Sequence, residues 1–261
     1  MATVVGRIKE IKQPRGGYIN PKAMKVRSLG TDTLGPLPLD VETVHASTMG
    51  MAVDYLTRME GGTEARDAFA VSLRGARLLG NEAVANAEAD VDNLTAGRID
   101  DGAIKAACRL VGYDVAFRAE PSMFNPNARS EPDVTTVNHI RAMLERSLKF
   151  FQEYGPVTAG RFTFPGAYTD LIQAGDGDFL TENTIWDFKV SVKPPTSAHT
   201  LQLLIYYLMG RRSDTSALFD PIQYLGVFNP RFDTVYRVAL DNIPTGILEE
   251  VSRNVIGYED A

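Results

Sequence analysis

Cysteine is nearly absent from this chain, because Cys108 is the only one among its 261 residues. A single cysteine excludes an intrachain disulfide framework and any zinc or iron–sulfur site that several cysteines would build. Long apolar runs are lacking as well: the most apolar stretch, from 201 to 209, is well short of the roughly 18 residues that a membrane span needs. No apolar segment follows the first basic residues, so the sequence predicts no secretory signal. We therefore expect a soluble, cytoplasmic protein without a membrane partner.

An excess of basic charge is also missing, since the formal net charge is −6. This acidic balance argues against a nucleic-acid binder held by a uniformly basic surface. The charge is nevertheless uneven: residues 1–30 carry seven Lys and Arg against one Glu, whereas residues 31–101 carry thirteen acids against five Arg. The basic N-terminal segment is typical either of an arm that follows phosphates or of a solvated strand and turn with its charges outward.

Hydrophobic periodicity divides the chain into a helical first half and a strand-rich second half. The first forty residues, interrupted by Gly and Pro, predict short strands and loops. Helices are expected over residues 41–59, 65–79, 81–96, 101–111, 133–154 and 198–209, with a last one opened by Pro244. Strands are expected over residues 161–164, 168–172, 184–192, 223–228 and 234–240, with a turn at 175–178.

This order of elements predicts an α/β fold with a mixed sheet in a single domain of residues 1–261. Within it we expect a basic segment over residues 1–30, a mostly helical elaboration over 31–130 and a sheet-containing core over 131–261.

The residues that carry chemistry are concentrated in the strand-rich half. Asp187 and Lys189 are two residues apart on a predicted strand, so their side chains project to the same face. With the preceding turn centred near Asp178, the two neighbouring strands pair so that Asp170 lies opposite Asp187. Asp178, at the tip of that turn, is the alternative partner of Asp187 and is less well placed.

Two carboxylates at one site repel each other unless a cation lies between them. Oxygen ligands suit Mg²⁺ or Mn²⁺, which can lower the pKa of a bound water and stabilise charge on a phosphate. Lys189 beside such a metal would steer the attacking water or neutralise the transition state. On the following predicted helix, Gln202 and Tyr206 are four residues apart and share a face, with His199 one turn earlier.

An Asp on one strand, Asp-x-Lys on the next and Gln-x-x-x-Tyr on a helix resembles the PD-(D/E)xK nuclease superfamily. The closest resemblance is to its RecB-like branch, which includes phage exonucleases and the nuclease domains of recombination enzymes. The resemblance implies that Asp170 and Asp187 bind the metal and that Lys189 assists the water. It also implies that Gln202 and Tyr206 support the site and contact DNA.

The resemblance covers residues 143–228 and implies a restriction-endonuclease-like core, a mixed central sheet flanked by helices. Family members use a further acid or a histidine on a preceding helix, for which Glu145 is our choice. Glu153, Glu120 and His139 compete with it. The carbonyl of Phe188 is another possible metal ligand, and His199 and Lys193 are expected to contact nucleic acid.

We therefore expect a Mg²⁺- or Mn²⁺-dependent deoxyribonuclease, an exonuclease, with DNA as its partner. Two other functions stay open. The first is a catalytically silent nuclease-fold module that binds a protein partner or a second copy of itself. The second is an effector in phage defence that cleaves RNA at the same site.

Overall fold

A computed structural model describes residues 2–94, 99–126 and 131–259, and the chain divides into two compact units. The sheet unit comprises residues 2–29, 150–229 and 234–259, and the helical unit comprises 30–149 and 230–233. The turn at 230–233, which joins the last two strands, thus belongs to the helical unit. Residue 130, where we expected the core to be separated from the helical elaboration, lies outside the described residues.

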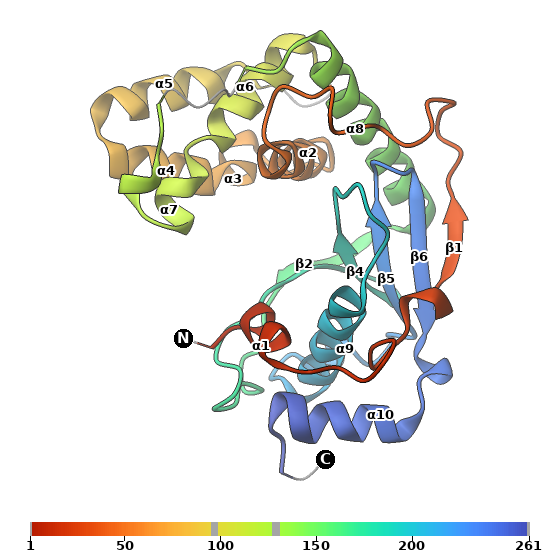
Figure 1. The fold of residues 1–261 in the computed structure, drawn as a ribbon. Coiled ribbons are helices and arrows are strands. Elements are labelled where there is room, and N and C mark those ends of the chain that lie inside the picture. The colour runs from red at the N-terminus through yellow and green to blue at the C-terminus, as the bar shows by residue number, and fades with distance from the viewer. Residues whose placement is uncertain (1, 95–98, 127–130, 260–261) are drawn as a thin grey trace. The chain divides into compact units, whose positions relative to one another are not determined.

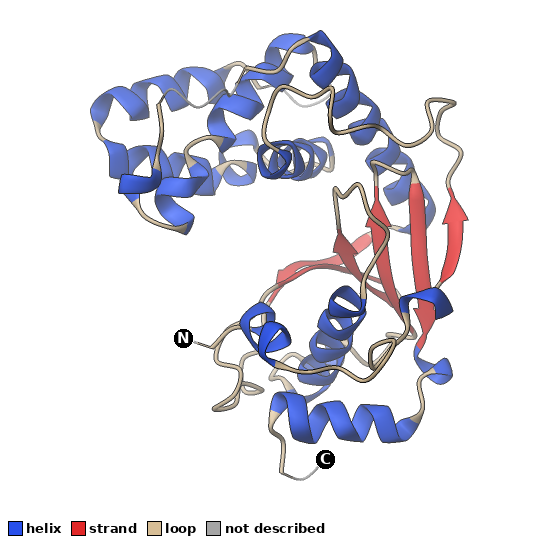
Figure 2. Ribbon diagram, in the orientation of Figure 1, coloured by secondary structure: helices blue, strands red, loops and turns tan. Residues whose placement is uncertain are grey.

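A six-stranded sheet forms the centre of the sheet unit (Figures 1 and 2). Its order is β1 (Lys25–Ser28), β6 (Thr234–Ala239), β5 (Tyr224–Asn229), β4 (Thr184–Phe188), β3 (Gly177–Thr181) and β2 (Val157–Phe162). β4 and β5 are parallel and are connected through α9 (Ser197–Arg212), whereas every other pair is antiparallel. The expectation of an α/β fold with a mixed sheet is confirmed.

The two faces of the sheet carry separate apolar cores. On one face α9 packs together with α1 (Val4–Glu10) and the C-terminal segment, α10 (Thr245–Glu250) and the π-helical turn Val251–Ile256. On the other face Phe150, at the C-terminal end of α8 (Val134–Tyr154), stacks on Phe228 and meets the edge of Trp186. Strand side chains alternate between these cores, so Ile185 faces α9, Trp186 faces away from it, and Asp187 returns to the α9 face.

The helical unit is built from helices around buried apolar side chains. They are α2 (Ala46–Glu60), α3 (Ala65–Ala68), α4 (Ala70–Leu79), α5 (Asn81–Asp92), α6 (Asp101–Val111), α7 (Asp114–Arg118) and residues 134–149 of α8. The buried carboxylate of Asp114 accepts hydrogen bonds from the hydroxyls of Tyr55 and Ser72, both at 2.6 Å. These bonds satisfy a charge that burial would otherwise penalise.

Several expected elements are confirmed: α6 has the expected bounds, and α8, α9, β5 and β6 lie where the sequence pattern placed them. β4 begins at Thr184 as expected but ends at Phe188 instead of at residue 192. The expected helix over 81–96 ends at Asp92, and its last two residues lie outside the described part. Among the described residues, no helix has the length and apolar character required to cross a membrane.

Three expectations for secondary structure were wrong. The N-terminal segment begins with helix α1, where we expected only strands and loops. Residues 168–172 form a tight turn instead of a strand, because the Thr169 hydroxyl accepts the N–H groups of Leu171 and Ile172 and donates to the carbonyl of Ile256. Such local side-chain bonds compete with strand pairing.

The third error was the turn expected at 175–178, where strand β3 begins at Gly177. A Cβ added to Gly177 would collide with the ring of Phe162 on β2, so glycine permits the close pairing of these strands. We had interpreted this glycine as a turn signal, and the pairing shows that it is a packing residue within a strand.

Candidate active site

The β3–β4 hairpin turns through only two residues, Glu182 and Asn183. Its register pairs Phe179 with Trp186, and continuing this register by one residue sets Asp178 opposite Asp187. The backbone N–H of Phe188 donates to Oδ2 of Asp178 at 2.7 Å, which ties this carboxylate to the end of β4. We call Asp178 and Asp187 the acidic pair.

Asp187 is the buried member of the acidic pair, with 3% of its surface exposed. Its Oδ1 forms an ion pair with Nζ of Lys189 at 2.9 Å. Its Oδ2 is buried and has no hydrogen-bond partner among the residues that the structure describes. An unsatisfied buried carboxylate oxygen is costly, and a ligand such as a metal ion would satisfy it.

Both carboxylates of the acidic pair are harder to ionise than a free aspartate, chiefly because of burial. Burial by the surrounding protein, followed by the negative charge of Asp187, raises the pKa of Asp178 to about 6, although part of the residue remains open to solvent. Burial also raises the pKa of Asp187, against the opposing effect of Lys189. Carboxyl pKa values raised by burial and by a neighbouring like charge are typical of functional sites.

Lys189 remains an ammonium ion at this site. Burial alone would lower the pKa of Lys189, but the charges of Asp187 and Asp178 outweigh it and the pKa is raised. A protonated lysine is a hydrogen-bond donor and a positive charge, not a base. Its chemical capacity is therefore to hold a water molecule or to neutralise charge that develops on a substrate.

Helix α9 supplies the polar side chains opposite the acidic pair. Nε2 of Gln202 donates to the hydroxyl of Tyr206 at 2.8 Å. Burial raises the pKa of Tyr206, and the nearby charges of Asp187, Asp178 and Asp176 raise it further, so the hydroxyl keeps its proton. These electrostatic effects indicate that Tyr206 lies near the acidic pair.

His199 lies in the first turn of the same helix and has a structural role there. The N–H of Thr196 donates to Nδ1 of His199 at 3.1 Å, as half of a capping box that fixes the start of α9. Burial, together with the positive charge of Lys189, lowers the pKa of His199, so its ring is neutral. One ring nitrogen is thus used by the cap, and the other can face a substrate.

The structure does not bring Asp170 to Asp187, contrary to our expectation. Asp170 is exposed in the turn that Thr169 stabilises, outside the sheet. The physical reason is the register of the hairpin, because the turn lies at Glu182 and Asn183 rather than near Asp178. The alternative that we considered less well placed, Asp178, occupies the position opposite Asp187.

The other predicted residues lie in different surroundings. Glu145 is exposed on the part of α8 that belongs to the helical unit, whereas the acidic pair belongs to the sheet unit. Glu153 forms an ion pair with Arg27 at 2.7 Å, and His139 is bonded to Glu42 at 2.7 Å. Lys193 is exposed in the loop that follows β4.

The acidic pair offers few protein ligands for a metal. No group of three or more His, Cys, Asp or Glu side chains with metal-binding geometry occurs in the part of the chain that the structure describes. Mg²⁺ is nevertheless commonly bound through one or two carboxylates, with waters and substrate phosphates completing its coordination. Two adjacent carboxylates, one with an unsatisfied buried oxygen, fit that mode.

Sequence reasoning undervalued Asp178 and missed Asp176, whose negative charge also raises the pKa of Asp178. The sequence after Asp178 did contain a signal for the hairpin. Phe179, Leu180 and Thr181 are typical strand residues, and only Glu182 and Asn183 separate them from the next predicted strand. A two-residue connection containing Asn is a recognised hairpin signal.

Comparison with known proteins found no relative: no family model, no curated protein and no solved structure matches this chain.

The pKa of Asp178 predicts how metal binding depends on pH. Because the metal-free protein keeps a proton on Asp178 up to about pH 6, a metal must displace that proton in acid. We expect the affinity for Mn²⁺ to fall about tenfold per pH unit below about pH 6 and to level off above it. Titration calorimetry in buffers of different ionisation enthalpy measures both affinity and proton release. A pH-independent affinity across this range would contradict a role for Asp178.

Proposed function

We propose that this protein is a Mg²⁺- or Mn²⁺-dependent nuclease that hydrolyses DNA phosphodiester bonds, with Asp178 and Asp187 as its metal ligands. The observation that carries the proposal is the unsatisfied, buried Oδ2 of Asp187 beside a second carboxylate. A buried carboxylate beside a second carboxylate is retained against its electrostatic cost where a cation compensates it.

The resemblance to the RecB-like branch supports the proposal, with one change of residue. The matched segment, 143–228, runs from α8 through β2, β3, β4 and α9 to β5, a mixed sheet with a helix on each face. Asp178 takes the role that we expected of Asp170. The other four residues of the motif keep their expected roles.

Each side chain then has a distinct part in hydrolysis. A bound divalent ion would lower the pKa of a water and stabilise charge on the scissile phosphate. The ammonium group of Lys189, 2.9 Å from Oδ1 of Asp187, is close enough to the ligands to orient that water or to neutralise the phosphate. Gln202 and the protonated Tyr206 hydroxyl hold one another and donate toward the acidic pair or the DNA backbone.

The chemistry is a simple hydrolysis. The oxygen of water forms a bond to phosphorus, the phosphorus–oxygen bond to the leaving nucleoside breaks, and a phosphate monoester and an alcohol result. As in our sequence-based expectation, we propose an exonuclease, which requires a free DNA end.

A cleavage assay with Lys189→Ala tests the proposal. We expect the wild-type protein to degrade linear duplex DNA with Mn²⁺ or Mg²⁺ and to leave circular DNA intact. Lys189→Ala should lower that rate by about 10²-fold or more, the usual effect of removing a group that stabilises transition-state charge. Lys25→Ala, on edge strand β1, is the matched control and should stay within about twofold.

Substrate choice discriminates among the alternatives. Degradation of RNA but not DNA would assign the site to the RNA-cleaving function. Full activity in Lys189→Ala would refute the proposed chemistry. Inactivity on all substrates together with no binding of Mn²⁺ would favour a silent binding module.

A further inference from the structure

The segment between α1 and β1 is fixed against the first turn of α9. Ile19 is buried in the core that α9 shares, and the Thr200 hydroxyl donates to the carbonyl of Ile19 at 2.7 Å. Gly17 lies so close to α9 that an added Cβ would collide with that of Ser197, and its φ of +85° favours glycine. Residues 9–19, which comprise the end of α1 and the loop that follows it and which we call the N-loop, are therefore anchored to this helix at their C-terminal end.

The same turn of α9 carries His199, which lies near Lys189. Ser197 and Thr200, which hold the N-loop, flank His199 in the sequence. The pKa of His199 is lowered by burial and by the positive charge of Lys189, so these two side chains are near one another. The N-loop is thus anchored to the end of α9 that adjoins the candidate active site.

The N-loop carries positive charge that the fold does not use. Lys9, Lys12 and Arg15 are exposed, and none of them forms an ion pair with a residue that the structure describes. By contrast, Arg7 on α1 is used structurally, because it donates to the carbonyls of Val255 and Asn254 at 3.0 Å. The unpaired cations belong to a chain whose net charge is −6.

An acidic site needs such cations if its substrate is a polyanion. Asp176, Asp178 and Asp187 repel a phosphate backbone, and Lys189 alone offsets only part of that charge. A cluster of cations on a rigid neighbouring loop attracts the backbone and lowers the cost of its approach. This favours the phosphate-following arm over a merely solvated segment.

We propose that the N-loop is a DNA backbone-binding element that guides a strand to the acidic pair, with Lys12 and Arg15 as its phosphate contacts. The identity of the polyanion rests on the proposed function. The contacts are to phosphates and not to bases, so they supply affinity without sequence preference.

Fluorescence anisotropy with a labelled DNA duplex, in the absence of divalent metal, tests this inference separately from cleavage. For the double variant Lys12→Gln/Arg15→Gln we expect Kd to rise about tenfold or more at ~0.1 M salt. The slope of log Kd against log salt should fall by about 1 for each charge removed. Lys25→Gln, which removes one charge from edge strand β1, should leave Kd within about twofold.

Every outcome decides the inference. Weaker binding in the double variant with an unchanged cleavage rate at saturating DNA supports both this inference and the proposed function. Weaker binding by a protein that never cleaves supports the inference and refutes the nuclease. Unchanged binding in the double variant, no binding by the wild-type protein, or loss confined to an RNA probe overturns the inference.

Discussion

Asp178→Asn lowers metal-dependent DNA cleavage by about 10²-fold or more, whereas Asp170→Asn leaves it within about twofold. The difference follows from the hairpin register, which sets Asp178 opposite Asp187 and leaves Asp170 in an exposed turn. Asparagine retains the size of the side chain and can still accept the hydrogen bond from the Phe188 N–H. It removes the negative charge that a metal ligand needs. Initial rates at saturating DNA and Mn²⁺ measure the effect.

Because a misfolded variant would also lose cleavage, the unfolding temperature of each variant is measured as a control. The pKa of Asp178 is higher in the folded protein, about 6, than the ordinary value of 3.8. The folded state therefore binds the proton more tightly, and the contribution of this group to stability is lost as pH rises from about 4 to about 6. Metal-free Asp178→Asn should accordingly unfold at the same or a higher temperature than the wild-type protein above pH 6. Equal loss of cleavage in both Asn variants, or loss only in Asp170→Asn, would reject our assignment.

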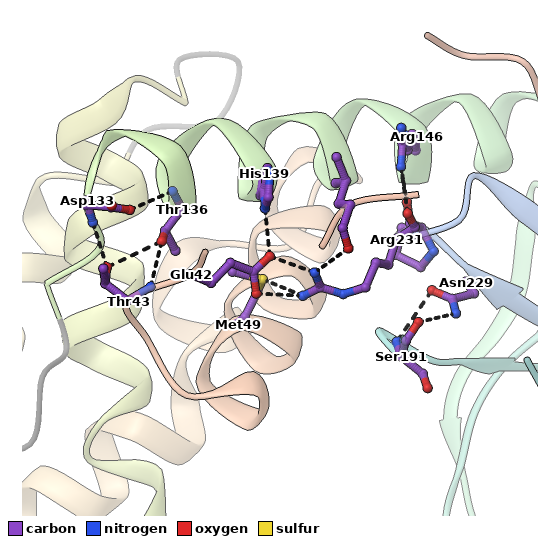
Figure 3. A network of polar contacts seen from close by, with 12 residues as sticks. Glu42, Thr43, Met49, Asp133, Thr136, His139, Arg146, Ser191, Asn229 and Arg231 are labelled. Atoms are coloured by element: carbon purple, nitrogen blue, oxygen red, sulfur yellow. Dashed lines mark hydrogen bonds and ion pairs between the residues drawn. The ribbon is translucent and has the colours of Figure 1, made fainter. Parts of the chain in front are cut away.

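Arg231→Met destabilises the helical unit by about 3–5 kcal/mol, the largest stability effect that we expect in this protein. Arg231 lies in the turn at 230–233, and 1% of its surface is exposed. Its guanidinium donates to both carboxylate oxygens of Glu42, at 2.6 and 3.0 Å, and to the carbonyl of Leu37 at 3.0 Å (Figure 3). Removing the arginine leaves the Glu42 carboxylate buried, with His139 at 2.7 Å as its one side-chain partner among the residues that the structure describes.

A double variant distinguishes an uncompensated charge from a loss of packing. In Arg231→Met/Glu42→Met both charges are gone, so we expect a large part of the lost stability to return. Arg77→Met removes an exposed arginine of the same unit and should change stability by less than about 0.5 kcal/mol. Denaturant unfolding followed by circular dichroism gives the three values. A cost below about 1 kcal/mol for Arg231→Met would show that this network adds little.

Local patterns predicted those parts of the site that lie close together in sequence. Asp187 and Lys189 share a face because strands alternate, and Gln202 and Tyr206 share one because a helix turns every 3.6 residues or so. The Asp187–Lys189 ion pair and the Gln202–Tyr206 hydrogen bond could therefore be expected from local spacing alone. For the same reason, strongly periodic helices such as α6 and α8 could be predicted closely.

The contacts that could not be predicted are those that depend on pairing between segments far apart in the sequence. The partner of Asp187 depends on where the hairpin turns, and a shifted turn exchanges Asp178 for Asp170. Gly177 packs against Phe162 of β2, fifteen positions earlier, and this pairing makes it part of strand β3 instead of a turn. Arg231 and Glu42 are 189 positions apart, so no local pattern links them.

The location of a bound Mn²⁺ is the most direct test of the proposed metal site. Anomalous diffraction from crystals of the wild-type protein grown with MnCl₂ would locate the ion without reference to activity. We predict an anomalous peak in contact with carboxylate oxygens of both Asp178 and Asp187. A peak beside Asp170, or the absence of any peak at Asp187, would contradict the account.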